Sequence, residues 1–320
     1  MGKQFINELK VGDAVQSDFA VVEKALNAFS QPNRAGEYFL RLQLADVTGT
    51  LRAVAWEQGP ELAALFEVGD VVRIRGEISN YHGPQLIIYS LEPVAPAEIN
   101  YEYFQKVAPR SRAEMLDELH EMINKVSHPY LQSLLQAFFA DEAFLQRYSQ
   151  APAARTVHHN YVGGLLEHAL ETAALCEYFV QLHPTLDLSL LICGALLHDV
   201  GKLEEYEVKG MSIQLTTAGK LLGHIMIGKE MLDAKIRQIP DFPADLHMQL
   251  AHLMLAHHGQ KEWGSPEIPR TFEAYALHHA DLISARLNQF AQAAQKSGHN
   301  SKWTEYDRLL ARDIYLGKAE

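Results

Sequence analysis

The chain has 320 residues, 48% of them hydrophobic and 21% charged, which is enough apolar material for two globular domains. No stretch approaches the roughly 18 apolar residues of a membrane-spanning helix, and the first residues lack the apolar core of an export signal, so we expect a cytoplasmic protein without a membrane partner. A net charge of −12 argues against a protein that simply coats nucleic acid.

The first hundred residues alternate between apolar and polar positions, as half-buried β-strands do. Leu40, Leu42 and Leu44 alternate with Arg41 and Gln43 in the clearest case. Four further strands are expected at residues 15–26, 51–56, 72–78 and 85–91, with a helical piece at 59–66. Five short strands with one helix between the third and the fourth predict an all-β OB-fold barrel.

Beyond a proline-containing stretch at 92–97 the apolar period becomes helical. Helices are expected at residues 112–125, 130–140, 164–182, 188–198, 223–236, 244–258 and 270–296. Cys176 and Cys193 fall inside these apolar patterns and are expected to be buried free thiols in a reducing compartment. The protein is therefore predicted to be multidomain: a barrel at 1–96, a linker with leading helices at 97–155, and an all-α domain at 156–320.

The second half carries an ordered series of histidines and aspartates. In chain order these are His168, His198-Asp199 followed by Gly201-Lys202, His224, His257-His258 and Asp281. Imidazoles and carboxylates without thiolates suit a divalent cation such as manganese, iron, cobalt, nickel or zinc, and argue against a structural zinc site. A single histidine on a helix is usually a packing or surface residue, so the series as a whole favours a metal centre. Such a centre can bind phosphoryl oxygens and lower the pKa of a water molecule.

This series resembles the HD superfamily of metal-dependent phosphohydrolases over roughly residues 155–295. The resemblance implies that His168, His198, Asp199 and Asp281 form the four-residue metal motif. It further implies ligands for a second metal at His224 and at His257 or His258, between which the sequence does not decide. Asp199 and Lys202 are the implied catalytic residues, and Lys202 matches a lysine near the substrate phosphate, with a simple helix-end cation as the alternative.

An OB-fold before an HD domain resembles the YhaM-type 3′–5′ exoribonucleases over nearly the whole chain. The segment HHNYVGGLLEH, ending at His168, strengthens this resemblance. It implies an enzyme supported by Mn²⁺ or Co²⁺, with one or two ions per chain, that removes nucleotides from the 3′ end of single-stranded RNA, with single-stranded DNA as a second candidate. His158, His159 and Tyr161 are candidates for contacting a substrate phosphate, against a packing role at the helix start.

The barrel is expected to bind the substrate strand through basic and aromatic groups. Arg41, Arg73 and Arg75 should lie on the outward strand faces, and Tyr81 should be exposed in a turn. Trp56 is a candidate for base stacking, but a place in the core is the favoured expectation for it. Acidic residues outnumber basic ones in residues 1–96, so binding should depend on a local groove and should be sensitive to salt.

Two other functions are compatible with the sequence. One is an HD phosphohydrolase of a small or cyclic nucleotide with a regulatory OB domain; the other is a non-catalytic single-strand-binding adaptor, which would lack metal ligands. Arg286, five residues beyond Asp281, should face away from it by helical phase. The sequence does not give the oligomeric state, although an acidic chain with a long C-terminal helix is compatible with a homo-oligomer.

Overall fold

The computed structural model of the protein describes residues 2–81, 83–104, 107–155, 157–209, 212–296 and 301–317. It divides into two compact units, Met1–Lys106 with Val208–Gln214, and Val107–Glu207 with Leu215–Glu320. Among the described residues, no helix has both the length and the apolar character needed to cross a membrane.

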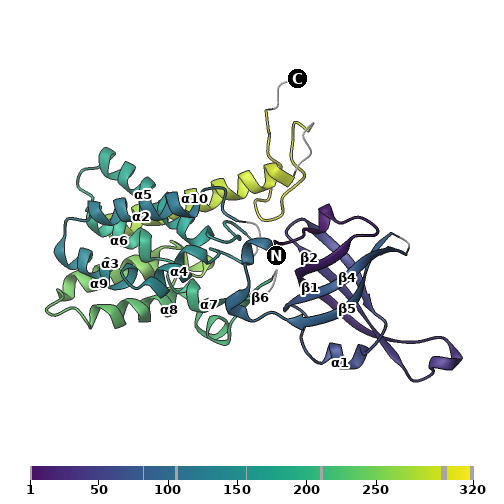
Figure 1. The fold of residues 1–320 in the computed structure, drawn as a ribbon. Helices are drawn as coiled ribbons and strands as arrows, with labels where there is room; N and C mark the ends of the chain where they lie inside the picture. The colour runs from purple at the N-terminus through teal and green to yellow at the C-terminus, as the bar shows by residue number, and fades with distance from the viewer. Residues whose placement is uncertain are drawn as a thin grey trace. The chain divides into compact units, whose positions relative to one another are not determined.

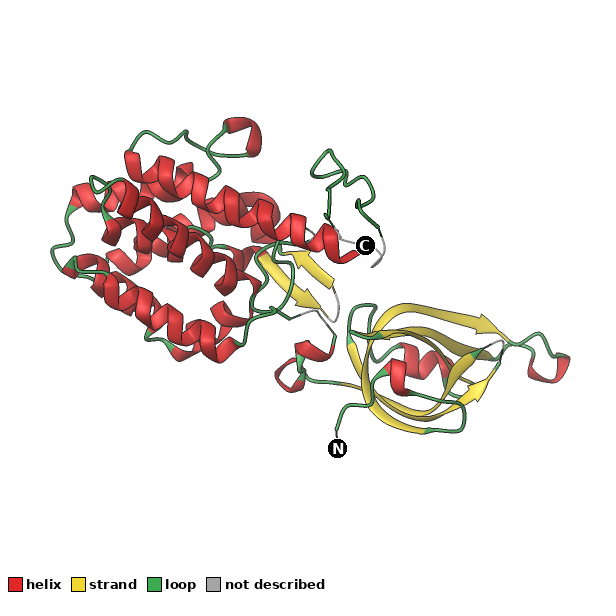
Figure 2. Ribbon diagram, turned by 90° about the horizontal axis from the view of Figure 1, so that it is seen from above, coloured by secondary structure: helices red, strands yellow, loops and turns green. Residues whose placement is uncertain are grey.

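The first unit holds a closed five-stranded barrel, seen from two directions in Figures 1 and 2. Its strands are β1 (Ala14–Ala28), β2 (Tyr38–Asp46), β3 (Gly49–Ala55), β4 (Val71–Asn80) and β5 (Pro84–Pro93), with α1 (Gly59–Ala63) between β3 and β4. The order around the barrel is β1-β2-β3-β5-β4, and β4 pairs back onto β1. Within the described barrel, β3 and β5 pair in parallel and the other strand pairs are antiparallel. This confirms the predicted OB-fold.

Alternation along the strands fills the barrel interior. Leu40, Leu42 and Leu44 are almost fully buried, whereas Arg41 between them is exposed. Val72 and Ile74 are fully buried on β4 as well, so the inward face follows the two-residue period read from the sequence.

The chain beyond β5 continues to pack on the barrel. Phe104 is buried in a cluster with Val94 and Val71, and the Val47 amide donates a hydrogen bond of 2.9 Å to the Tyr103 carbonyl. We therefore propose that the first domain extends to about residue 106, and that the helices after it belong to the second domain instead of to a linker.

The second unit is built from helices. They are α2 (Arg112–Lys125), α3 (Pro129–Phe139), α4 (Glu142–Gln150), α5 (Gly164–Leu182), α6 (Leu188–Leu197), α7 (Lys202–Glu205), α8 (Thr217–Ile236), α9 (Ala244–Ala256) and α10 (Phe272–Lys296). The predicted all-α architecture is confirmed. The chain also forms a hairpin of β6 (Tyr206–Lys209) and β7 (Ser212–Leu215), most of which, Val208–Gln214, groups with the first unit. The hairpin was not predicted, because four-residue strands are too short to give a clear periodic signal. Helix α4 and the first turns of α8 were also not predicted.

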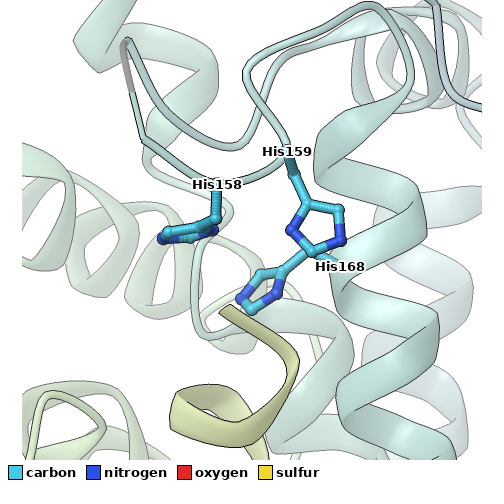
Figure 3. Close-up of side chains that lie close together, drawn as sticks. All are labelled: His158, His159 and His168. Carbon is cyan, nitrogen blue, oxygen red and sulfur yellow. The ribbon is translucent and has the colours of Figure 1, made fainter. Parts of the chain in front are cut away.

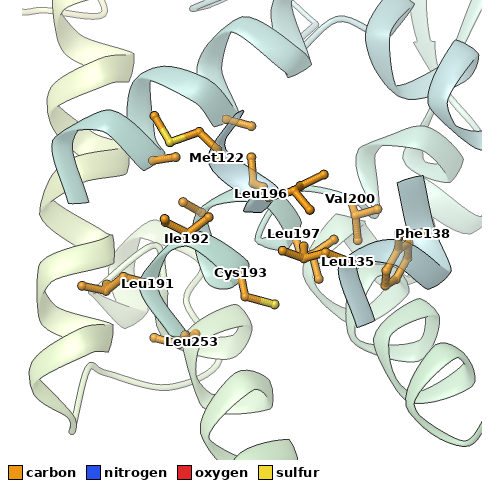
Figure 4. Packing of buried hydrophobic residues seen from close by; sticks show 14 of the residues in the cluster. Met122, Leu135, Phe138, Leu191, Ile192, Cys193, Leu196, Leu197, Val200 and Leu253 are labelled. Carbon is orange, nitrogen blue, oxygen red and sulfur yellow. The ribbon is translucent and has the colours of Figure 1, made fainter. Parts of the chain in front are cut away.

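Helix α6 lies at the centre of this unit because it is apolar on all sides. Every residue from Ser189 to Leu197 is buried, and α5 and α10 both pack against the helix. Figure 4 shows its side chains among Met122 of α2, Phe138 of α3 and Leu253 of α9. Cys176 and Cys193 are buried free thiols, as predicted. The C-terminal end of α6 is therefore fixed in the interior of the unit.

Gly201 and Gly223 shape the contact between the turn that follows α6 and helix α8. A Cβ atom on Gly201 would lie 2.0 Å from the carbonyl oxygen of His224 and 2.5 Å from the amide nitrogen of Gly228, so two backbones touch where no side chain fits. Gly223 interrupts α8 with φ 72°, in the left-handed region that favours glycine, and the next amide, that of His224, donates to Oε1 of Glu205 at 2.9 Å.

Candidate metal centre

Several helices of the second unit deliver imidazoles and carboxylates to one place. The contributors are His168 from α5, His198 and Asp199 at the end of α6, His224 from α8, His257 and His258 at the end of α9, and Asp281 from α10. Metal-compatible groupings of ligand atoms include His168, His198 and Asp281 in one set, and His224, His257 and His258 in another. The structure thus brings together every residue predicted for the metal motif.

The first set faces Oδ2 of Asp199. His198 Nε2 lies 3.3 Å and His168 Nε2 lies 3.6 Å from that oxygen. His168 Nε2 is also 3.1 Å from Oδ1 of Asp281 and 3.3 Å from His198 Nε2. Four ligand atoms from α5, α10 and the end of α6 therefore share one small volume.

The second set faces the other oxygen of the same carboxylate. His224 Nε2 lies 3.4 Å and His257 Nε2 lies 3.7 Å from Oδ1 of Asp199. The His258 ring centroid is 5.2 Å from that of His224 and 4.4 Å from that of His257. Since one ligand atom of each of these three histidines lies within 4.8 Å of the others, both His257 and His258 belong to the group.

In His198 and His257, the Nδ1 atom faces a backbone carbonyl oxygen. His198 Nδ1 lies 2.8 Å from the Ala195 carbonyl oxygen, and His257 Nδ1 lies 2.7 Å from that of Met254. Because a carbonyl oxygen can only accept, Nδ1 carries a proton, which leaves Nε2 as the atom that can bind an ion. At metal sites, the histidine ring nitrogen that does not bind the ion usually donates a hydrogen bond in this way.

His168 and His224 are oriented by side chains instead. His168 Nδ1 lies 2.9 Å from Oγ of Ser284, whose hydroxyl donates to Oε2 of Glu171 at 2.6 Å, so the serine oxygen accepts from the imidazole. His224 Nδ1 lies 3.2 Å from Oε1 of Glu205. Both rings therefore also direct Nε2 toward Asp199.

Buried polar atoms without hydrogen-bond partners mark the middle of the cluster. Among the described residues these include Asp199 Oδ1, His224 Nε2 and His257 Nε2. Each such atom costs about 1–3 kcal/mol unless a ligand satisfies it. The spacings of 3.1–3.7 Å between ligand atoms are close to those of atoms bonded at about 2.0–2.2 Å to a shared ion. The residues present therefore fit a divalent metal ion.

Local electrostatics also favour the metal-binding forms. Burial would raise the pKa of Asp199, but Lys202 and His198 outweigh it and hold that pKa well below its usual range. Burial lowers the pKa of His257 well below its usual range, and the neighbouring His258 adds to this effect. His198 is the exception, because Asp199 outweighs burial and raises its pKa, so a bound cation would take the place of that proton.

A cavity of about 320 Å³ opens at the cluster. Its lining includes Asp199, Asp281 and Lys202, whose Nζ lies 2.5 Å from Oδ2 of Asp199. Lys202 thus pairs with the carboxylate between the two sets while it faces the cavity. Arg286 also lines the cavity, so the expectation that it faces away from Asp281 is wrong. Arg286 shares one helical face with Leu282, Ala285 and Gln289, which also line the cavity, so the lining extends beyond the face that Asp281 alone defines.

The loop before α5 sends its two adjacent histidines to different places. Figure 3 shows His158 and His159 on this loop, with their rings beside that of His168. His158 lines the cavity, and burial, with a smaller effect of His168, lowers its pKa to about 2. His159 is fully buried with φ 46°, and its Nε2 lies 3.3 Å from Oε2 of Glu171.

Tyr161 is also buried and packs inside the unit. Its hydroxyl donates to Oε2 of Glu167 at 2.5 Å and accepts from Nδ2 of Asn288 at 2.8 Å. Neither His159 nor Tyr161 lines the cavity, and both are buried, so the packing alternative is favoured for them over contact with a substrate phosphate. His158 does line the cavity and stays a candidate for that contact.

The barrel candidates are placed mostly as expected. Arg41 and Arg75 are exposed, and Tyr81 is 63% exposed in its turn. Arg73 is half-buried and its Nε lies 2.8 Å from Oδ1 of Asp18, so this arginine is already engaged in an ion pair. The prediction that Trp56 belongs to the core is wrong, since its side chain is 41% exposed.

Three features of the site were missed in the sequence. Ser284 lies three residues after Asp281, on the same helical face, and could have been found by that spacing. Glu205 reaches His224 only because Gly223 interrupts α8, and the sequence pattern gives no signal for such a break. Trp263 lines the cavity from a short 3₁₀ turn that has no periodicity to detect.

Two family models match this chain. Residues 165–286 match the HD domain, and residues 21–94 match an OB-fold nucleic acid binding domain. Fold and site together define an HD-domain protein of the metal-dependent phosphohydrolase class, joined to an OB-fold.

Similar curated proteins cover most of the chain. The 3′–5′ exoribonuclease YhaM of Halalkalibacterium halodurans is 35% identical over 297 residues, covering 90% of this chain and 88% of that protein. The YhaM proteins of Shouchella clausii and Bacillus subtilis are each 32% identical, covering 91% and 82% of this chain and 89% and 82% of their own length. The chain belongs to the YhaM family of 3′–5′ exoribonucleases.

Proposed function

We propose that this protein is a divalent-metal-dependent 3′–5′ exoribonuclease that hydrolyses single-stranded RNA to nucleoside 5′-monophosphates. The observation that carries the proposal is Asp199, whose two carboxylate oxygens face two separate groups of imidazoles. Membership of the YhaM family supports the choice of reaction and polymer. Single-stranded DNA is a second substrate to be tested.

The proposed ligands divide between two positions. His168, His198, Asp199 and Asp281 would hold one ion, and Asp199, His224, His257 and His258 would hold the other. Nitrogen and oxygen donors without a thiolate suit Mn²⁺ or Co²⁺. Such ions supply a Lewis acid for the phosphoryl oxygens and lower the pKa of a water molecule into the physiological range.

The remaining cavity groups would bind and orient the scissile phosphate. The Lys202 ammonium is held against Asp199 at the cavity wall, where it adds positive charge for the anionic phosphate. His158 stays neutral because burial lowers its pKa, so its imidazole can hydrogen bond with a phosphate oxygen without adding charge. Neither group needs to move a proton for these roles.

The proposal is tested with single-stranded RNA labelled at its 5′ end, incubated with the protein and Mn²⁺. We expect a ladder that shortens from the 3′ end, releases nucleoside 5′-monophosphates, and disappears with a chelator. Intact RNA together with hydrolysis of a small or cyclic nucleotide would favour the small-nucleotide phosphohydrolase. Bound but uncleaved RNA, with no small nucleotide hydrolysed, would favour the adaptor.

The orienting carboxylate of His224 gives a prediction about metal affinity. Glu205→Gln weakens the acceptor for Nδ1, so the affinity for Mn²⁺ is expected to fall about 10- to 100-fold. Glu204→Gln is the matched control, because Glu204 pairs with Arg147 at an exposed position. Calorimetric titration with Mn²⁺ measures both, and equal affinities for the two variants would remove Glu205 from the site.

The barrel offers an aromatic face for single strands. Trp56 packs against Phe39 with ring centroids 4.9 Å apart, and Phe39 shares the outward face of β2 with Arg41. Trp56→Ala should weaken oligonucleotide binding by about 1–3 kcal/mol, the usual value of one base stack.

Binding is measured by anisotropy of a labelled oligonucleotide at fixed salt, in an Asp199→Ala background that prevents degradation. The matched control is Tyr89→Ala, which removes another exposed aromatic side chain of the barrel. An affinity that is equal in the Trp56 and Tyr89 variants would exclude Trp56 from the binding face.

A further inference from the structure

One exposed indole lines the cavity at the metal-binding groups. Trp263 is 48% exposed and shares this lining with Lys202, His224 and Asp281. A single exposed tryptophan on a surface needs no explanation. This one contributes a broad apolar face beside groups that are otherwise suited to a phosphate.

The segment that carries this indole is held in place. Trp263 ends a 3₁₀ turn, η5 (Lys261–Trp263), and its carbonyl oxygen lies 3.2 Å from Nδ1 of His258. Ser265, which is buried, donates its hydroxyl to the Glu267 carbonyl at 2.6 Å. The indole is therefore attached to the same short segment that orients a proposed metal ligand, and only the backbone of Trp263 makes that orienting contact.

The cavity is small and has polar groups beside the indole. Its volume of about 320 Å³ lies at the lower end of the roughly 300–1,000 Å³ of small-molecule sites, which suits one nucleotide better than a stretch of strand. Arg286 and Gln289 of α10 also line it, and Arg286 Nη1 donates to Oε1 of Gln289 at 2.9 Å. These groups can hydrogen bond with a sugar or with the edge of a base.

We propose that this cavity is a subsite for a single nucleotide, whose base stacks on Trp263 while its phosphate lies at the metal-binding groups. The inference rests on the proposed function and adds the base-binding wall. Stacking on an aromatic ring tolerates every base, since each base has a π face. A subsite that binds one nucleotide of any base is what removal of terminal nucleotides from mixed sequences requires.

The test compares binding of two ligands to the full chain with Mn²⁺ present. Adenosine 5′-monophosphate has a phosphate and a base, whereas ribose 5-phosphate lacks the base. We expect the nucleotide to bind about 5- to 150-fold more tightly, the effect of one stack, and to quench tryptophan fluorescence. Calorimetry gives both affinities without reference to hydrolysis.

Three variants assign the effect to one indole. In Trp263→Ala, the affinities for the nucleotide and for ribose 5-phosphate should become nearly equal. Trp263→Phe should keep most of the preference for the nucleotide, because phenylalanine still presents an aromatic face. Trp303→Ala, which removes another exposed tryptophan, should change neither affinity. Circular dichroism confirms that each variant is folded.

The outcomes separate this inference from the proposed function. If the protein degrades RNA but shows no preference for the nucleotide, or a preference that survives in Trp263→Ala, the subsite is overturned and the exoribonuclease stands. If the preference depends on Trp263 but no RNA is degraded, the subsite is supported and the exoribonuclease fails. Absence of any binding by the nucleotide overturns the subsite.

Discussion

Replacing Asp199 with alanine is expected to reduce RNA hydrolysis by at least about 1,000-fold. The change removes both oxygens around which the imidazoles gather, His198 Nε2 on one side and His224 Nε2 on the other. It also leaves the buried Lys202 ammonium without its carboxylate partner. The expected loss of activity therefore has two causes: the proposed metal ions lose a shared ligand, and a positive charge at the cavity is left unpaired.

Initial rates on labelled single-stranded RNA at saturating Mn²⁺ measure this loss, with circular dichroism as the check on folding. Asp245→Ala is the matched control, because Asp245 is exposed in the first turn of α9 and bonds Gln249. Hydrolysis by the Asp199 variant within tenfold of the wild-type rate would remove this carboxylate from the mechanism.

Gly201→Ala is expected to destabilise the helical unit by about 3 kcal/mol or more. An added methyl group would meet the carbonyl oxygen of His224 at 2.0 Å, and backbone on both sides leaves nothing flexible to give way. The turn that would have to move carries Asp199 toward His224, so hydrolysis should fall along with stability.

Thermal unfolding, followed by the helical signal in circular dichroism, measures the effect as a fall of roughly 6–12 °C in Tm. Gly49→Ala is the control, since its added methyl group meets only Cγ2 of Ile6 at an ordinary 3.7 Å. Equal Tm values for the two variants would show that the close approach at Gly201 does not matter for stability.

Much of the architecture could be predicted because buried positions recur along each strand or helix as a periodic pattern of apolar residues in the sequence. The barrel follows from alternation such as Leu40, Leu42 and Leu44, and α6 follows from its uninterrupted apolar run. The metal centre could be predicted from the order of its histidines and aspartates, although His224 and Asp281 lie inside α8 and α10 and not at helix ends.

What could not be predicted depends on single backbone conformations or on how far the cavity extends along α10. His158 and His159 are adjacent in sequence, yet a left-handed residue at His159 buries one ring and leaves the other in the cavity. Glu205 meets His224 only through the interruption at Gly223. Arg286 lines the cavity on the helical face of Leu282, and the phase relative to Asp281 alone does not show this.

The most direct test of the account is the number of Mn²⁺ ions bound per chain, measured by equilibrium dialysis on the purified protein. Two ions are predicted for the wild type, one for His224→Ala, which alters only the second set of ligands, and fewer than one for Asp199→Ala. Two ions bound to the Asp199→Ala chain, or none bound to the wild type, would contradict a metal centre organised around this carboxylate.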